Sequence, residues 1–125
     1  MAGKMITLIC EDDILIAQNI MEEMAAAGLT TVGPARDSDE AMNAAQEHDV
    51  SIAVIDLTLS DGRSGVALAR ALHRRGCAII VCSGDFLTPE ELSDVDHKFL
   101  RKPTPPGAIV DCVRAAIRGQ RSPSQ

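Results

Sequence analysis

Four short, mostly hydrophobic runs recur along the chain: 5–10, 51–56, 77–82 and 97–100. Because apolar residues follow one another in these runs without alternation, they are typical of strands buried on both faces of a parallel sheet. The segment 30–35 favours a fifth strand at the edge of the sheet, since it contains Pro34, which is tolerated at an edge or a strand end. The pattern therefore predicts five strands.

Apolar residues between these strands return at the three- and four-residue spacing of amphipathic helices. Five helices are expected: from Ile14 to a stop at Gly28, behind a Ser38 cap, from Gly65 to Arg75, behind a Thr88 cap, and from Thr104–Pro106 onward. The start at Thr88 is strong, with Pro89 at the first helical position and Glu91 three residues after the cap. Few apolar residues follow it, so this fourth helix should be short or loose.

Strands and helices alternate five times, which predicts an α/β fold, a doubly wound (βα)5 parallel sheet with right-handed crossovers. We expect a single domain over residues 1–125, with a core over about 4–118 and a flexible tail over 119–125. In such a sheet, ligands bind at the carboxyl ends of the strands.

The net charge limits the classes of partner. The chain carries −6, with 18 acidic residues against 12 lysines and arginines, and it contains no Trp or Tyr. An acidic protein without base-stacking aromatics is poorly suited to direct binding of nucleic acid. The N-terminus lacks the features of a signal peptide, and no apolar run is long enough to span a membrane. We therefore expect a cytoplasmic protein that contacts neither membrane nor nucleic acid.

The four cysteines are Cys10, Cys77, Cys82 and Cys112. They lie in apolar stretches and show no C-x-x-C spacing, so buried free thiols are expected rather than a zinc site or a disulfide framework.

Polar residues follow four of the predicted strands. Counted in chain order, Glu11 and Asp12 follow the first strand (5–10), and Asp56 ends the third (51–56). Ser83 follows the fourth (77–82), and Lys102 follows the last (97–100). Three clustered carboxylates need a cation, and a site of oxygen ligands with few protein donors suits Mg²⁺. A lysine and a hydroxyl opposite the metal would complete a site for phosphoryl transfer to an aspartate.

With these residues in place, the sequence resembles the receiver domains of two-component response regulators over about residues 4–117. The resemblance is carried by the acids after "LIC", by "VIDLTLSDGRSG", by "VCSG" and by "FLRKP", which occur in the family's order. It implies a flavodoxin-like sheet with strand order 2-1-3-4-5.

The resemblance also implies roles for the acids. Asp56 would be the phosphoacceptor, and Asp12 a direct ligand of Mg²⁺. Glu11 would act through metal-bound water, and the backbone carbonyl of Thr58 would be a further ligand. Asp13 is then expected to cap the helix that starts at Ile14, so the working acid pair is Glu11–Asp12 rather than the visible "DD".

The remaining family positions have counterparts as well. Ser83 resembles the switch hydroxyl, Lys102 the lysine that pairs with the phosphoryl group, and Phe99 an aromatic that turns inward on activation, although Phe99 could equally be plain core. The Lys102–Pro103 bond would be the family's cis peptide.

Two side chains near the expected phosphoryl group, Thr58 and Asp85, are candidates for tuning the lifetime of the phosphate. Two positions depart from the family pattern: Ser60 stands where a proline is usual, and residue 99 is Phe where Tyr is usual.

The resemblance implies a signal carrier that takes a phosphoryl group from a histidine kinase or a phosphotransfer protein and then binds a downstream protein. It would assist its own phosphorylation and dephosphorylation without being an enzyme in the usual sense. Two alternatives stay open: a pseudo-receiver that binds a partner without phosphorylation, and a small phosphatase with an aspartate nucleophile. The phosphatase is disfavoured because Thr58 lies where haloacid-dehalogenase-like hydrolases have a general acid.

Overall fold

A five-stranded parallel sheet, in the order β2-β1-β3-β4-β5, forms the centre of the computed structural model, which describes residues 5–121. The elements are β1 (Ile6–Cys10), α1 (Ile14–Ala26), β2 (Thr30–Ala35), α2 (Ser38–His48), β3 (Ile52–Ile55), α3 (Gly65–Arg74), β4 (Ala78–Ser83), β5 (His97–Arg101) and α4 (Ala108–Arg121). The predicted fold class and strand order are confirmed, with β2 at one edge and β5 at the other.

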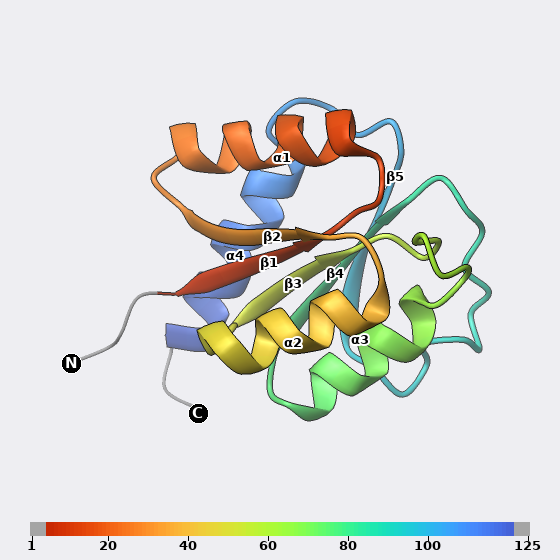
Figure 1. Cartoon of the computed structure of the whole chain (residues 1–125). Helices are drawn as coiled ribbons and strands as arrows, with labels where there is room; N and C mark the ends of the chain where they lie inside the picture. Colours follow the sequence, from red (N-terminus) through yellow and green to blue (C-terminus); the bar gives the residue numbers. More distant parts are fainter. Residues whose placement is uncertain (1–4, 122–125) are drawn as a thin grey trace.

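Two hydrophobic layers cover the sheet, one on each face (Figure 1). Leu8, Ile55 and Val81 point toward α2 and α3. An adjacent residue on each of these strands faces α1 and α4 instead: Ile9, Val54 and Cys82. The uninterrupted hydrophobic runs follow from this arrangement, because both faces of the sheet are buried. With few aromatic residues in the chain, aliphatic side chains fill most of the core.

The caps of α1 and α2 differ in how well the sequence predicted them. Asp13 caps α1, as expected, and its carboxylate accepts hydrogen bonds from the N–H groups of Leu15 at 3.0 Å and Ile16 at 3.2 Å. The prediction of a Ser38 cap for α2 was wrong, since Asp37 takes that position and accepts from the Glu40 N–H at 2.8 Å. Ser38 instead donates its hydroxyl to Asp61, a residue of the β3–α3 loop, at 2.5 Å.

The connection between β4 and β5 holds the main departure from the predicted elements. No helix occurs in residues 84–96, where residues 89–94 form turns (Figure 1). The start at Thr88 is partly realised, because its N–H donates to the Glu91 side chain at 2.8 Å, yet no α-helix follows. The structure therefore has four helices in the described residues rather than the five expected.

The last helix also differs from expectation at both ends. It begins at Ala108, after a turn in which the Ala108 N–H donates to the Pro105 carbonyl at 3.1 Å, and it continues to Arg121. The first residues of the predicted tail, 119–121, are thus helical, while 122–125 lie outside the described residues, as do residues 1–4. None of the helices within residues 5–121 is both long and apolar enough to cross a membrane.

All four cysteines are free thiols, as predicted. Cys10, Cys77 and Cys82 are buried, and Cys112 is half-buried. Burial also raises the pKa of the Cys82 thiol to about 11, so this side chain behaves as a small hydrophobic group.

Candidate functional site

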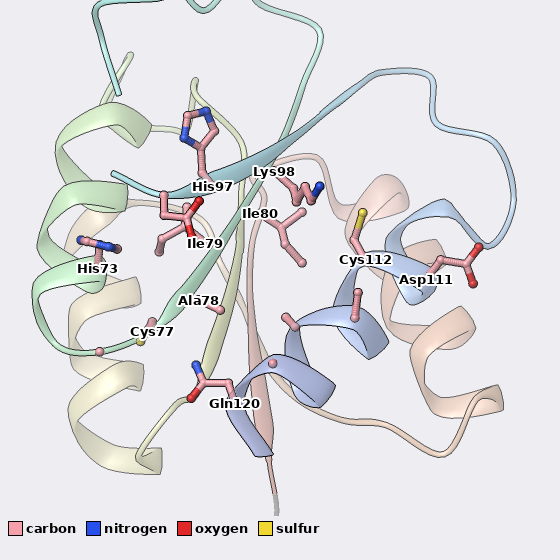
Figure 2. A pocket seen from close by; sticks show the side chains of 15 residues that line it. His73, Cys77, Ala78, Ile79, Ile80, His97, Lys98, Asp111, Cys112 and Gln120 are labelled. Atoms are coloured by element: carbon pink, nitrogen blue, oxygen red, sulfur yellow. The ribbon is translucent and has the colours of Figure 1, made fainter. Parts of the chain in front are cut away.

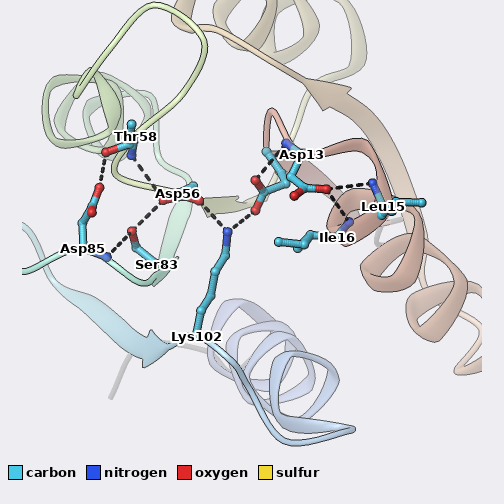
Figure 3. Close-up of polar contacts among 9 residues, drawn as sticks. Asp13, Leu15, Ile16, Asp56, Thr58, Ser83, Asp85 and Lys102 are labelled. Carbon is cyan, nitrogen blue, oxygen red and sulfur yellow. Dashed lines mark hydrogen bonds and ion pairs between the residues drawn. The ribbon is translucent and has the colours of Figure 1, made fainter.

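The carboxyl ends of four adjacent strands meet at one edge of the sheet. There they bring together Asp56 after β3, Ser83 at the end of β4 and Lys102 after β5 (Figure 3). Glu11, which follows β1, joins this group through Lys102. Glu11, Asp56 and Ser83 are buried, at 3%, 8% and 0% exposure. Polar groups buried to this degree require partners, and each of them has at least one here.

Asp56 lies at the centre of this group, and both of its carboxylate oxygens accept hydrogen bonds. Oδ1 accepts from the Ser83 hydroxyl at 2.6 Å and from the Thr58 N–H at 3.2 Å, and Oδ2 accepts from Lys102 Nζ at 2.5 Å. The carboxylate is therefore held in a fixed orientation by a hydroxyl, a backbone amide and an ammonium group. This is a set of donors that can also neutralise charge on a group attached to Asp56.

Lys102 bridges the two buried acids, because its Nζ also donates to Glu11 Oε1. Burial raises the pKa of Glu11, against the opposing effect of its hydrogen bond from Lys102. For Lys102, burial alone would lower the pKa, but the hydrogen bonds and charges of Asp56 and Glu11 outweigh it and raise the pKa. Lys102 thus stays protonated and serves as the counter-ion of the pair.

The start of α3 packs directly against the strand end that carries Asp56, and glycine at position 65 makes this possible. A Cβ atom on Gly65 would lie 2.2 Å from the Asp56 carbonyl oxygen and 2.5 Å from Leu57 Cα. The Gly65 N–H also donates to the Leu57 carbonyl at 2.9 Å. Sequence reasoning missed this role, although a glycine at the first position of a helix, where it is a poor helix former, was a signal.

Asp12 is placed differently from the other two acids. It is exposed, and its side chain makes no hydrogen bond within residues 5–121, whereas Glu11 Oε2 accepts from the Asp13 N–H at 3.1 Å. Within residues 5–121, no three His, Cys, Asp or Glu side chains converge as a ready-made metal site. The donors nevertheless suit Mg²⁺ in kind, since they are all oxygens and Lys102 balances only one of the two carboxylates that it contacts.

Two loops meet above Asp56 through Thr58 and Asp85. The Thr58 hydroxyl donates to the Asp85 carboxylate, and the Asp85 N–H donates to the Ser83 hydroxyl oxygen at 3.2 Å (Figure 3). Both residues are exposed, so this contact closes one side of the site at its opening to solvent.

The other predicted positions surround this group. The Lys102–Pro103 peptide bond is cis, and Phe99 is half-buried against the α2–α3 layer. Ser60 donates both its N–H, at 2.8 Å, and its hydroxyl, at 2.9 Å, to the Arg36 carbonyl. A proline has no N–H, so the usual family residue could not make the first of these bonds.

Two concave regions flank the sheet. One, of about 720 Å³, lies beside the site and is lined by Lys102, Pro103, Cys82, Ile16 and Ile109 among others. The second, of about 840 Å³, lies between the end of α3, the first residues of β4 and β5, and α4 (Figure 2). Its lining includes Cys77, Ala78 and Cys112 but none of the four side chains clustered at the carboxyl edge.

Comparison with solved structures gives the same fold at low identity. The receiver domain of PhyR from Erythrobacter litoralis is 23% identical, with 98% of this chain and 97% of that chain covered and a TM-score of 0.80. The signal receiver domain of a modulated diguanylate cyclase from Desulfovibrio desulfuricans is 22% identical, with 95% and 98% covered and a TM-score of 0.84. PhyR from Brucella abortus is 28% identical, with 92% of this chain and 46% of that chain covered and a TM-score of 0.69.

The family assignment comes from the sequence itself. No curated protein matches the chain closely enough to count as a relative. The family model of the response regulator receiver domain, however, matches residues 7–114, which is most of the chain and includes every residue described above at the carboxyl edge. The chain therefore belongs to the response regulator receiver domain family.

Proposed function

We propose that this receiver domain accepts a phosphoryl group on Asp56 from a histidine kinase or a phosphotransfer protein, and signals by binding a downstream protein. The observation that carries this proposal is the set of three donors on the Asp56 carboxylate: the Ser83 hydroxyl, the Thr58 N–H and the Lys102 ammonium group. A carboxylate that only capped a helix would not need a half-buried lysine and a buried hydroxyl.

The transfer is a displacement at phosphorus. An Asp56 carboxylate oxygen attacks the phosphorus atom, the P–N bond of the donor phosphohistidine breaks, and the imidazole leaves with the electron pair and takes up a proton. The Lys102 ammonium and the Ser83 hydroxyl lie on opposite oxygens of Asp56, so they can neutralise charge on the phosphoryl oxygens. Hydrolysis by water then breaks the acyl phosphate and restores the carboxylate.

Mg²⁺ would be held by Asp12, Asp56 and the Thr58 backbone carbonyl, with Glu11 acting through metal-bound water. It would supply positive charge to the phosphoryl oxygens. The exposed position of Asp12 leaves its carboxylate available to such a cation.

The added phosphoryl group, with a charge of roughly −2 at pH 7, increases the negative charge beside Ser83 and Asp85. The Asp85 carboxylate accepts a hydrogen bond from the Thr58 hydroxyl at the opening of the site. We therefore expect these two side chains to influence the attack by water and hence the lifetime of the phosphate. Phe99, half-buried in the middle of β5, is the candidate that transmits the change to a protein partner in the cytoplasm.

Intact-mass spectrometry after treatment with acetyl phosphate and Mg²⁺ tests the proposal. The wild type should gain one phosphoryl group, and Asp56→Asn should gain none. Asp61→Asn is the matched control, because Asp61 lies five residues further along the same loop region and is exposed to solvent, so this variant should be labelled like the wild type.

Label on Asp56→Asn would refute the acceptor role of Asp56. Failure of the wild type to accept label, from acetyl phosphate and from a range of histidine kinases, would favour a pseudo-receiver. Continued release of phosphate from small phosphate esters would favour the phosphatase alternative.

A further inference from the structure

The segment that joins β4 to β5, residues 84–96, is held in place largely by contacts with other parts of the molecule. Within it, three backbone N–H groups donate to the carbonyl three residues earlier: Glu91 to Thr88 at 3.2 Å, Ser93 to Glu90 at 3.4 Å and Val95 to Leu92 at 3.0 Å. These are bonds of turns rather than of an α-helix, in which each N–H donates to the carbonyl four residues earlier.

Two arginines outside this segment fix it through matching contacts. Arg63 forms a bidentate ion pair with the Glu91 carboxylate and donates to the Phe86 carbonyl. Arg70, on α3, forms a bidentate ion pair with the Asp94 carboxylate, at 2.9 and 3.1 Å, and donates to the Glu91 carbonyl at 2.8 Å. Each guanidinium therefore binds one side chain and one backbone carbonyl of the segment.

The contact between Arg70 and the Glu91 carbonyl competes with helix formation. In an α-helix that starts after Thr88, the Glu91 carbonyl would accept from the Val95 N–H. In the structure this carbonyl accepts from Arg70, and the Val95 N–H turns to Leu92 instead. The bond that would extend the helix beyond its first turn is thus replaced by a bond to an arginine.

The segment itself is suited to a helix. Thr88 is a good cap, Pro89 fits the first helical position, and the Glu91 side chain already accepts from the Thr88 N–H, which is half of a capping box. Glu90 and Glu91 would lie in the first turn, where negative charge is favourable. Leu92 and Val95, the two buried anchors of the segment, are three residues apart and would share one face of the helix.

We propose that residues 88–96 are a latent helix, kept in turns by the contacts of Arg63 and Arg70, so that the β4–β5 connection can exist in two forms. The segment begins next to the candidate site, where Asp85 contacts Ser83 and Thr58, and Arg63 lies in the loop that follows Asp56. A structural change in either loop would therefore alter the arginine contacts that set the populations of the two forms. This inference concerns the segment alone and does not require that Asp56 is phosphorylated.

Carbon-13 chemical shifts of residues 90–95 test the proposal in the double variant Arg63→Gln/Arg70→Gln. The Cα shifts should move toward helical values, with the ratio of helical to turn form rising roughly tenfold, because two exposed ion pairs that favour the turns are lost. The control is Arg36→Gln, which removes an exposed arginine–glutamate pair at 3.7 Å outside the segment and should leave these shifts unchanged.

A second measurement on the wild type guards against a double variant that does not fold. Raising the salt to about 1 M, where the Debye length is about 3 Å, should weaken the same ion pairs and move the shifts in the same direction. The proposal would be overturned if the Cα shifts stayed at their values for the wild type in low salt, both in the double variant and at high salt. Random-coil values under both conditions would overturn it as well.

Discussion

This receiver domain contains two networks of ion pairs between basic side chains and carboxylates, and the two networks differ in burial. At the carboxyl edge, Lys102 pairs with Glu11 and Asp56, with side chains 18%, 4% and 10% exposed. In the β4–β5 segment, Arg63 and Arg70 pair with Glu91 and Asp94, with side chains between 26% and 57% exposed. Buried charges depend on one another because water cannot replace a lost partner, whereas exposed charges are readily solvated. The first network can therefore hold a fixed site, and the second can hold a segment that changes its conformation.

The largest effect is expected from removing the shared cation of the buried network. Lys102→Met should lower the free energy of unfolding by about 3 kcal/mol, because two buried carboxylates are left without their counter-ion. Urea denaturation measures this loss, and Mg²⁺ should restore part of it if the acids bind the metal. Lys98→Met, which removes an exposed lysine of β5, the strand that Lys102 follows, should cost less than about 0.5 kcal/mol. Equal losses in the two variants would mean that burial does not distinguish the site.

A somewhat smaller effect is expected at the backbone that supports the site. Gly65→Ala should destabilise the fold by about 2 kcal/mol, since the new Cβ would collide with backbone atoms that cannot turn aside. Gly119→Ala, in a helix where a Cβ meets nothing within 4 Å, should be neutral or stabilising. The two melting temperatures, measured side by side, check this; an unchanged value for Gly65→Ala would refute the close packing at Asp56.

The exposed network should tolerate the loss of an ion pair. Arg70→Gln should lower the free energy of unfolding by about 0.5 kcal/mol at low salt, and by less at high salt because exposed pairs are screened. Urea denaturation at two salt concentrations measures both numbers. A loss as large as that of Lys102→Met would show that the segment is a rigid part of the core, which contradicts the comparison.

The smallest effect concerns an exposed carboxylate that is held by hydroxyl groups. The hydrogen bonds from Ser38 and Ser64 lower the pKa of Asp61 to about 2 from its usual 3.8. A lowered pKa stabilises the folded state above pH 3.8, and this contribution is lost as the pH falls toward 2. The stability difference between wild type and Asp61→Asn should therefore shrink over that range. A stability difference that stays constant with pH would show that the hydrogen bonds from Ser38 and Ser64 do not lower the pKa of Asp61.

Much of the fold followed from local patterns in the sequence. The hydrophobic runs mark where buried strands end, and parallel strands bring their carboxyl ends to one edge, so the meeting of Asp56, Ser83 and Lys102 could be predicted. The assignment of Asp13 as a cap was also within reach, because a cap depends on the two or three residues that follow it.

The features that were missed depend on residues distant in the chain. The carboxylate of Asp37 caps α2 while Ser38 binds Asp61, a partner 23 residues away. Likewise, the strong helix start at Thr88 does not become a helix, since Arg70, on another element, takes the carbonyl that the helix needs. Gly65 shows the same limit, because its role is set by the backbone of Asp56 and Leu57, just after β3. The roles of Asp12 and Asp85 stay predictions that need solution experiments.

The most direct test of the central claim is to locate the phosphoryl group. After treatment with acetyl phosphate and Mg²⁺, borohydride reduction converts a phosphorylated aspartate to homoserine, and peptide mass spectrometry then finds its position. The account predicts homoserine at position 56 and nowhere else. Homoserine at position 12, 13 or 61 in place of 56 would contradict it.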